Sequence, residues 1–290
     1  METHVQDDTS SFFEPPYYPT AAQAWAVILW YILASIVCCI PAIPLMLKFP
    51  AQQLPILLAA SMLADLTLIF FLAWKKRRQR EPGFRPHFRK VSPGLLLACI
   101  PATLALILLE DPLNFLHLPD WAEDIFAQLG NTPGIFILFV TIVGPVMEEI
   151  IFRGIVLDGL LKNYKPKFSI LISSAVFAII HMNPAQTASA FIAGLLLGWV
   201  YYRTRSLWPC ICIHIINNGL FTALSLLFPS VKTSDSLWQL IDHKSYYFAA
   251  MLAALLIMWL FVTLLNKKST SPENKLSAMA DAPFTEEEHE

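Results

Sequence analysis

Long apolar segments, separated by short polar ones, dominate the pattern of residues along the chain. Eight of them approach the roughly 20 mostly apolar residues that a membrane-spanning helix needs. They cover residues 22–47, 53–74, 91–109, 133–161, 168–182, 186–202, 206–228 and 246–266. The fifth is the shortest, and the fourth is over-long and contains Pro145. The pattern predicts an all-α fold, a polytopic membrane helix bundle of about eight transmembrane helices.

The polar ends of the chain contrast with this apolar centre. Residues 1–21 begin with acidic residues, serine and threonine, so we expect a disordered cytoplasmic tail and no cleavable signal peptide. Residues 22–268 form the predicted transmembrane bundle, with a motif-bearing core at 133–228. Residues 269–290 are polar and end in Glu-Glu-Glu-His-Glu, which favours a second disordered cytoplasmic tail over a weak metal site. Residues 118–130 fit either an amphipathic helix on the outer interface or an ordinary loop.

Composition agrees with a membrane location. Apolar residues make up 56% of the chain and charged residues 14%, and the mean hydropathy is +0.55. A soluble chain carries roughly 25% charged residues, so part of this surface faces lipid. The net charge of −2 argues against a nucleic-acid partner, which would select a basic domain. All five cysteines lie in apolar stretches, where they act as small core residues and not as a disulfide framework.

The distribution of basic residues predicts the orientation, because cytoplasmic loops carry an excess of lysine and arginine. Segment 75–90 alone carries eight basic residues. If it is cytoplasmic, sixteen of the twenty basic residues fall on that side. Segment 110–124, between the third and fourth spans, has five acidic residues and no basic one. We therefore expect a multi-pass protein of the cell inner membrane with both termini in the cytoplasm.

The fourth span contains charged residues that are costly inside a membrane. Each such charge costs at least about 2.5–3.5 kcal/mol on insertion scales, so it needs a partner or a purpose. Glu149 and Arg153 have the favourable spacing for a helical ion pair, and we interpret them as structural. Glu148 has Phe152 four residues on, and therefore no cation on its own helix at that spacing. A desolvated carboxylate of this kind suits a general base that another helix faces.

Two neighbouring spans supply further polar groups. His181 lies near the end of the fifth span, nearer the outer face than His214 in the seventh. Asn218 is four residues beyond His214, so both lie on one face of their helix. Each residue alone would more often be a hydrogen-bonded core residue than a catalytic one. Because three spans contribute such groups to an apolar bundle, we expect a shared polar site.

Three motifs, in order, carry a resemblance to a known family: Glu-Glu-x-x-x-Arg at 148–153, Phe-x-x-x-His at 177–181 and His-x-x-x-Asn at 214–218. Over roughly residues 133–228 the chain resembles the CPBP group of intramembrane proteases. This group includes the type II CAAX prenyl endopeptidases and the bacterial Abi, or bacteriocin-immunity-like, proteins. No motif position departs from the pattern.

The resemblance implies an activity and a role for each motif residue. The chain would be an intramembrane endopeptidase acting on a peptide or lipid-modified protein in contact with membrane lipid. Glu148 and His181 would activate the attacking water, and His214 and Asn218 would stabilise the oxyanion, as peptide hydrolysis requires. The two charged residues of the structural pair would brace the motif helix. The cavity would open to the cytoplasm, as in similar eukaryotic enzymes.

The same residues allow a metal alternative. Glu148, His181 and His214 resemble the His₂Glu zinc site of metalloproteases. The His-Glu-x-x-His helix of such enzymes is absent, and Asn218 is a poor zinc ligand but a good oxyanion donor. We therefore favour a mechanism with no cofactor and keep zinc as the alternative.

Two other function classes stay open. One is a non-proteolytic membrane scaffold or bacteriocin-immunity protein that keeps the same polar cluster for folding. The other is a transporter with a proton relay through buried Glu and His, although no pair of broken helices in two halves supports it. No oligomeric state is predicted.

Three features outside the motifs have structural interpretations. Gly194-x-x-x-Gly198 favours close helix packing inside the bundle over dimerisation. Asp65 is a lone acid in the second span, for which a structural hydrogen bond is favoured over a place in a cavity wall. Asp158 marks a helix end at the cytoplasmic face.

Overall fold

The structure is a computed structural model that describes residues 16–79, 87–121, 134–228, 230 and 235–269. These residues form helices, and the only β-pairing among them is an isolated bridge between Phe88 and Ser206. The predicted all-α fold class is confirmed. The helices are α1 (Ala21–Cys39), η1 (Ile40–Ala42), α2 (Ile43–Lys48), η2 (Pro50–Gln52), α3 (Gln53–Arg78), α4 (Pro93–Glu110), η3 (Asp111–Leu116), α6 (Gly134–Leu138), η5 (Phe139–Val143), α7 (Gly144–Glu149), η6 (Ile150–Leu157), α8 (Asp158–Asn163), α9 (Pro166–Ile179), α10 (Pro184–Thr204), α11 (Leu207–Leu227), α12 (Leu237–Leu240) and α13 (Lys244–Ser269).

Each of the eight predicted spans contains a helix. Six helical segments of the described chain are long and apolar enough to cross a membrane: Ala21–Lys48, Pro50–Arg78, Pro93–Leu116, Gly134–Asn163, Leu207–Leu227 and Lys244–Lys267. The other two predicted spans correspond to α9, a shorter apolar helix of 14 residues, and to α10, of 21 residues. A polytopic helical bundle is therefore confirmed, whereas a count of eight crossings stays a prediction.

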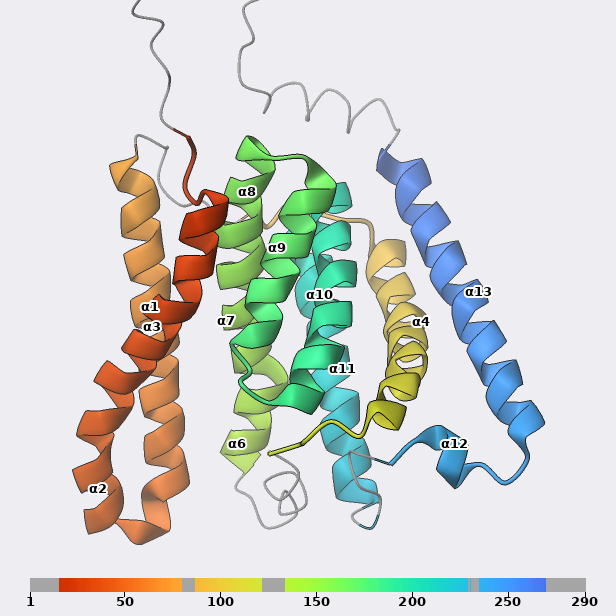
Figure 1. The fold of residues 1–290 in the computed structure, drawn as a ribbon, viewed down its shortest axis with the longest axis horizontal. Helices are drawn as coiled ribbons and strands as arrows, with labels where there is room; N and C mark the ends of the chain where they lie inside the picture. The colour runs from red at the N-terminus through yellow and green to blue at the C-terminus, as the bar shows by residue number, and fades with distance from the viewer. Residues whose placement is uncertain (1–15, 80–86, 122–133, 229, 231–234, 270–290) are drawn as a thin grey trace, which may run out of the picture.

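The helices stand side by side, roughly along one direction, with some neighbours antiparallel and others parallel (Figure 1). α1 and α3 pack together at one side, and α4 and α13 lie at the other. The continuous helix from α6 to α8 stands between them with α9, α10 and α11. Two apolar cores result: one centred on α1, α3, η6 and α9, and one on α4, α10, α11 and α13.

One end of the bundle, uppermost in Figure 1, carries most of the basic residues, and we call it the basic end. It is formed by the last turns of α3, α8 and α10 and the first turns of α9 and α11, with α1 beginning and α13 ending there. Its basic residues include Lys75, Lys76, Arg77, Arg78, Lys162, Lys165, Lys167, Arg203 and Arg205. We call the opposite end the far end.

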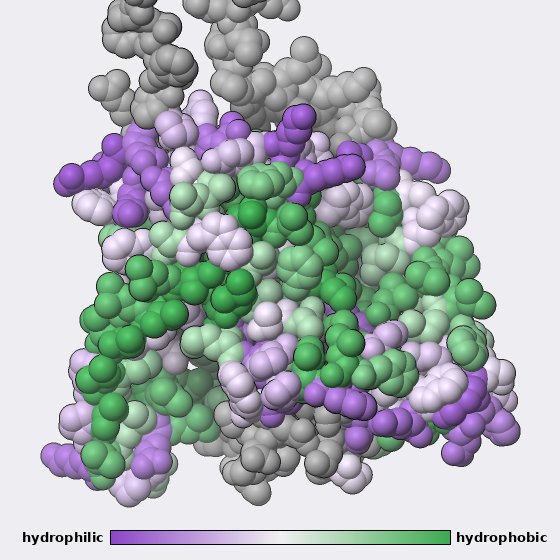
Figure 2. All heavy atoms as spheres, in the orientation of Figure 1, coloured by the Kyte–Doolittle hydropathy of each residue, from purple (hydrophilic) through white to green (hydrophobic). Residues whose placement is uncertain are grey.

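The sides of the bundle are suited to lipid. Figure 2 shows a broad apolar band between polar residues at both ends. Large apolar side chains project outward from the outer helices, among them Leu29 at 62% exposure, Phe70 at 71% and Leu252 at 68%. Exposed apolar surface of this extent marks contact with a membrane or a partner.

Asp158 contacts side chains from several segments at the basic end. Its carboxylate lies 3.0 Å from the Lys76 ammonium and 3.4 Å from that of Lys162, and it accepts a hydrogen bond from the Tyr201 hydroxyl at 3.3 Å. The imidazole of His87 lies 3.3 Å from the same carboxylate. Asp158 lies among these basic residues, but the helix continues through it to Asn163, so the interpretation of Asp158 as the end of the helix is wrong.

Two glycines allow α9 and α10 to approach closely. A Cβ added at Gly194 would lie 3.0 Å from the Ser174 Cβ, and one at Gly198 would lie 3.0 Å from the Ile170 side chain. Both contacts lie inside the bundle. The interpretation of Gly194-x-x-x-Gly198 as internal packing is therefore confirmed.

The N-terminal boundary of the bundle lies earlier than residue 21. Asn163 receives the Tyr17 N–H on Oδ1 at 2.9 Å and donates to the Tyr17 carbonyl at 2.7 Å, and Tyr18 is buried. The segment just before α1 is therefore packed against α8. Residues 1–15, 122–130 and 270–290, to which the two tails and the interfacial helix were assigned, lie outside the described residues.

Candidate active site

The motif helix has wide π-helical turns on both sides of the two glutamates, in η5 and η6. Such turns are rare and occur frequently at functional sites. In η5 the Gly144 N–H bonds to the Phe139 carbonyl, five residues back. Pro145 comes next and has no N–H with which to continue this pattern to Val140. The Val140 carbonyl instead accepts a hydrogen bond from the Asn218 side-chain amide at 3.1 Å.

Glu149 is the fully buried charge of the site. Its Oε1 accepts a hydrogen bond from Arg153 at 2.9 Å, the helical ion pair expected from the spacing. The same oxygen lies 2.8 Å from Nδ1 of His214. Glu149 and Arg153 are 0% and 1% exposed, so neither charge can be hydrated in compensation. Glu149 therefore both neutralises Arg153 and orients His214, a second role that the spacing did not predict.

The Phe177 ring contacts the ion pair on one side and both histidines on others. The Arg153 guanidinium lies 4.4 Å from the centroid of the Phe177 ring. The same ring contacts the imidazoles of His181 and His214 edge to face, at centroid distances of 5.0 and 5.7 Å. The sequence identified Phe177 only as a motif position. Its aromatic contacts hold both imidazoles in place.

Glu148 differs from its neighbour in having few polar contacts. Its Oε2 lies 3.7 Å from Nε2 of His214, too far for a hydrogen bond. That oxygen is buried and has no hydrogen-bond partner in the described part of the chain. The sequence pairs Glu148 with His181, whereas the short distance is to His214. The side chain is 23% exposed and faces a cavity.

The hydrogen bonds of the two histidines determine which ring nitrogen faces the cavity. Nδ1 of His181 lies 2.9 Å from the Phe177 carbonyl, and because a carbonyl only accepts, Nδ1 carries the proton. Nδ1 of His214 is likewise the donor to Oε1 of Glu149, the oxygen that also accepts from Arg153. In both residues Nε2 is the nitrogen left for chemistry.

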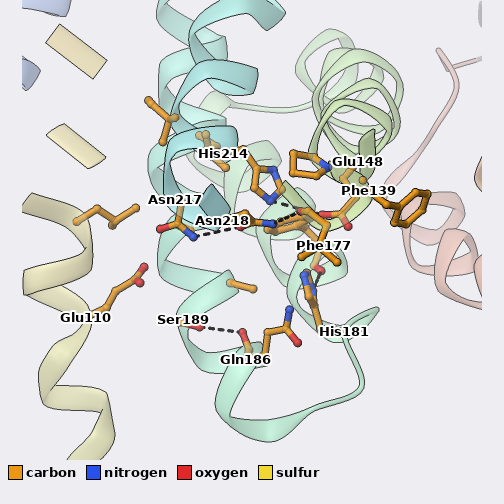
Figure 3. A pocket seen from close by; sticks show the side chains of 18 residues that line it. Glu110, Phe139, Glu148, Phe177, His181, Gln186, Ser189, His214, Asn217 and Asn218 are labelled. Atoms are coloured by element: carbon orange, nitrogen blue, oxygen red, sulfur yellow. Dashed lines mark hydrogen bonds and ion pairs between the residues drawn. The ribbon is translucent and has the colours of Figure 1, made fainter. Parts of the chain in front are cut away.

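The four predicted catalytic residues line one cavity of about 210 Å³. Figure 3 shows their side chains converging on it from the motif helix, the end of α9 and α11. The polar residues that line it are Glu110, Glu148, His181, Gln186, Ser189, His214, Asn217 and Asn218. The structure thus brings the predicted residues together, while Asp65, buried in α3, is not among the lining residues.

Four of the polar lining residues were not predicted to belong to a site. Gln186 and Ser189 lie in the first turns of α10, and Glu110 ends α4. Asn217 donates a hydrogen bond to Oδ1 of the adjacent Asn218 at 3.4 Å. Glu110 belongs to the acidic segment that was used only to predict orientation. Nothing in its local pattern distinguishes a cavity residue from a loop residue.

The cavity extends into the half of the bundle away from the basic end. Glu110 is the last residue of α4, and Gln186 and Ser189 lie in the first two turns of α10, at the far end. His181 follows α9 at that end, whereas His214 lies only seven residues into α11 from the basic end. His181 therefore lies nearer the far end than His214 does, whereas the assignment of the far end to the outer face stays a prediction. We expected a cavity that opens to the cytoplasm, at the basic end. The positions of these lining residues do not agree with that expectation.

The donor set fits zinc in part only. Each histidine donates Nδ1–H to a carbonyl or carboxylate, as zinc-bound histidines commonly do. Among the residues that the structure describes, however, no three His, Cys, Asp or Glu side chains are grouped closely enough to hold a metal ion. No chemical step is therefore derived through a metal.

Comparison with known proteins identifies the motif-bearing segment. Residues 130–220 match the family described as type II CAAX prenyl endopeptidase Rce1-like. The chain is 33% identical over 92 residues to "Putative membrane peptidase YdiL" of Bacillus subtilis (strain 168), a match that covers 32% of this chain and 38% of that protein. It is 32% identical over 101 residues to "Membrane-embedded CAAX protease MroQ" of Staphylococcus aureus (strain USA300), covering 33% and 41%.

Each of these two matches covers about a third of this chain, and the chain spans about two fifths of the length of these curated relatives. No solved structure matches the chain. The resemblance of the motif-bearing segment to the CPBP group is confirmed.

The adjacent glutamates make a matched pair for a test of stability. Glu149→Gln leaves the buried Arg153 without a counter-charge, so we expect the free energy of unfolding to fall by about 3–5 kcal/mol. Glu148→Gln removes no hydrogen bond from Oε2, so the free energy of unfolding of this variant should stay within about 1 kcal/mol of the parent value. Reversible unfolding by SDS in mixed micelles measures both. Similar losses in the two variants would contradict the assignment of different roles.

Proposed function

We propose that this chain, with residues 130–220 matching the Rce1-like family, is an integral membrane endopeptidase. It hydrolyses a peptide bond near the bilayer. One observation carries the proposal: the Glu148 carboxylate, without a hydrogen bond to Oε2, faces a cavity lined by two histidines that present Nε2. A carboxylate held in this way has no evident structural role. It is therefore suited to act as a general base.

Glu148 and His181 act on the attacking water. The water binds between the Glu148 carboxylate and Nε2 of His181, the nitrogen opposite the one that bonds to Phe177. Glu148 accepts a proton as the water oxygen attacks the scissile carbonyl. It then returns that proton to the leaving amine, so that the carboxylate is regenerated.

Asn218 and His214 stabilise the oxyanion. Asn218 uses one amide hydrogen on the Val140 carbonyl and has the second for the substrate. Because Nδ1 of His214 donates to the Glu149 carboxylate, His214 donates through Nε2 only in the form in which both ring nitrogens carry protons. Glu149 and Arg153 are thus positioning residues, which act on the reaction through His214.

The substrate class follows from the same proposal. A peptide or lipid-modified protein in contact with membrane lipid is the proposed substrate, as the name of the relative MroQ suggests for that protein. The basic residues favour an inner-membrane protein with both termini in the cytoplasm. The alternative, a scaffold or immunity protein, needs the Glu149 ion pair for folding but gives no reason for Glu148.

The proposal predicts that Glu148→Gln and His181→Ala abolish processing. General-base catalysis contributes about 10²–10⁴-fold, and loss of the Asn218 donor should cost about 10²–10³-fold. Mass spectrometry of membrane peptides from cells carrying each variant measures the loss of cleavage products. Asp242→Asn, an exposed acid outside the cavity, is the matched control. The protease assignment fails if processing survives in both variants at unchanged protein levels.

Metal dependence has a separate test. A glutamate mechanism predicts that purified protein retains its peptidase activity after exhaustive chelation, because no step needs a metal. Activity on the peptides identified above is measured before and after chelation and after titration with zinc. Loss of activity that stoichiometric zinc restores would replace this mechanism with the zinc alternative.

A further inference from the structure

Two thiols from different helices meet between α4 and α11. Sγ of Cys99, in α4, lies 3.3 Å from the Leu95 carbonyl oxygen. Sγ of Cys212, in α11, lies 3.9 Å from the next carbonyl oxygen of α4, that of Leu96. Because these carbonyls are consecutive in one helix, both sulfur atoms lie against the same turn of α4. The two thiols are within hydrogen-bonding reach of each other, and both are free in the structure.

The other three cysteines have different surroundings. Cys210 is two residues before Cys212, about 200° away around α11, and its Sγ lies 3.4 Å from the Leu197 carbonyl oxygen of α10. The remaining two lie at the end of α1. Among the five cysteines, all of which the structure describes, Cys99 and Cys212 are therefore the pair that two facing helices bring together.

The two thiols differ in accessibility. Cys99 is 0% exposed, whereas Cys212 is partly exposed, so a reagent that reaches the pair meets Cys212 first. Neither is among the described residues that line the cavity. Both lie in segments that are long and apolar enough to cross a membrane. A reagent for this pair is therefore one that dissolves in the bilayer.

We propose that Cys99 and Cys212 are an oxidation site, at which an organic hydroperoxide in the bilayer converts the two thiols to a disulfide that joins α4 to α11. The Cys212 sulfur attacks the hydroperoxide and forms an S–O bond, while the O–O bond breaks and the thiol proton leaves with the alcohol. The Cys99 sulfur then attacks the Cys212 sulfenic acid, forming the S–S bond and releasing water. The two thiols lose two electrons, which reduce the hydroperoxide to alcohol and water.

This disulfide joins two helices that line the cavity. α4 contributes Leu106 to the lining and α11 contributes His214. Cys99 lies seven residues, or about two turns, before Leu106 on the same face of α4, and Cys212 lies two residues before His214. Because a covalent S–S bond is shorter than a contact between two thiols, its formation draws the two helices together. A displacement of about 1 Å can cost about 100-fold in rate, so oxidation slows peptide cleavage, an effect that rests on the proposed function.

Peptide mapping of the full chain in lipid nanodiscs detects the disulfide without any need for substrate cleavage. Reduced protein is treated with cumene hydroperoxide, the remaining thiols are blocked, and tryptic peptides are analysed by mass spectrometry. Trypsin places Cys99 in peptide 91–153, and it places both Cys210 and Cys212 in peptide 206–232. Variants therefore decide which thiol has reacted. Cys210→Ser is the matched control for Cys212→Ser, since both substitutions lie in one peptide.

We expect cumene hydroperoxide to link peptides 91–153 and 206–232 in the parent chain and in Cys210→Ser, and not in Cys99→Ser or Cys212→Ser. Oxidation of the parent and of Cys210→Ser should slow cleavage of the peptides identified by the processing experiment by about 10- to 100-fold. Reduction with a phosphine should restore the rate. Cys99→Ser, which cannot form the link, should keep its rate after the same treatment.

Three outcomes overturn the proposal. Absence of the link in protein that unfolds like the untreated parent shows that the two thiols do not combine, and a link that Cys210→Ser removes assigns the reaction to another pair. Linked protein that cleaves as fast as reduced protein removes the effect on the peptidase. Mapping does not depend on catalysis, so active Glu148→Gln protein would refute the proposed function and leave the mapped disulfide standing.

Discussion

The buried carboxylate of Glu149 is the interaction on which the rest of the site depends. A single oxygen bonds to both Arg153 and His214, in an environment where none of these groups can be fully hydrated. Removing one partner of a buried pair costs far more than the pair contributes, so the three side chains hold one another in place. Through His214 this network extends from the motif helix to α11, and through the Phe177 ring it extends to α9 and His181.

Glu148 is adjacent to Glu149 in sequence but makes few polar contacts. The network engages Oε1 of Glu149, and it leaves Glu148 facing a polar cavity, with His214 as its nearest imidazole at 3.7 Å. The wide turns of η5 and η6 surround both residues, and Pro145 leaves the Val140 carbonyl for Asn218. In the proposed mechanism, stability and reactivity are divided between two glutamates on one helix. Glu148 can remain available to accept a proton because the adjacent Glu149 makes the contacts that stabilise the site.

Much of this arrangement could be predicted from the sequence, where periodicity and spacing are local. The eight apolar segments contain helices, Glu149 pairs with Arg153, and Gly194 and Gly198 pack against α9. What could not be predicted depends on contacts between distant segments. A uniform helical rotation of 100° per residue gave no sign of the π-helical turns, which reset the direction of Glu148. The approach of His214 to both glutamates, and of Glu110 to the cavity, follows from how α11 and α4 pack.

The orientation of the two imidazoles is the most direct test of this account, because the proposed roles of His181 and His214 require Nε2 to face the cavity. Nitrogen-15 NMR of histidine-labelled protein, with signals assigned by His181→Ala and His214→Ala, reports which ring nitrogens carry protons. The account predicts a protonated Nδ1 in both residues, because each Nδ1 faces an oxygen that only accepts. A tautomer protonated only at Nε2, in either residue, would contradict it.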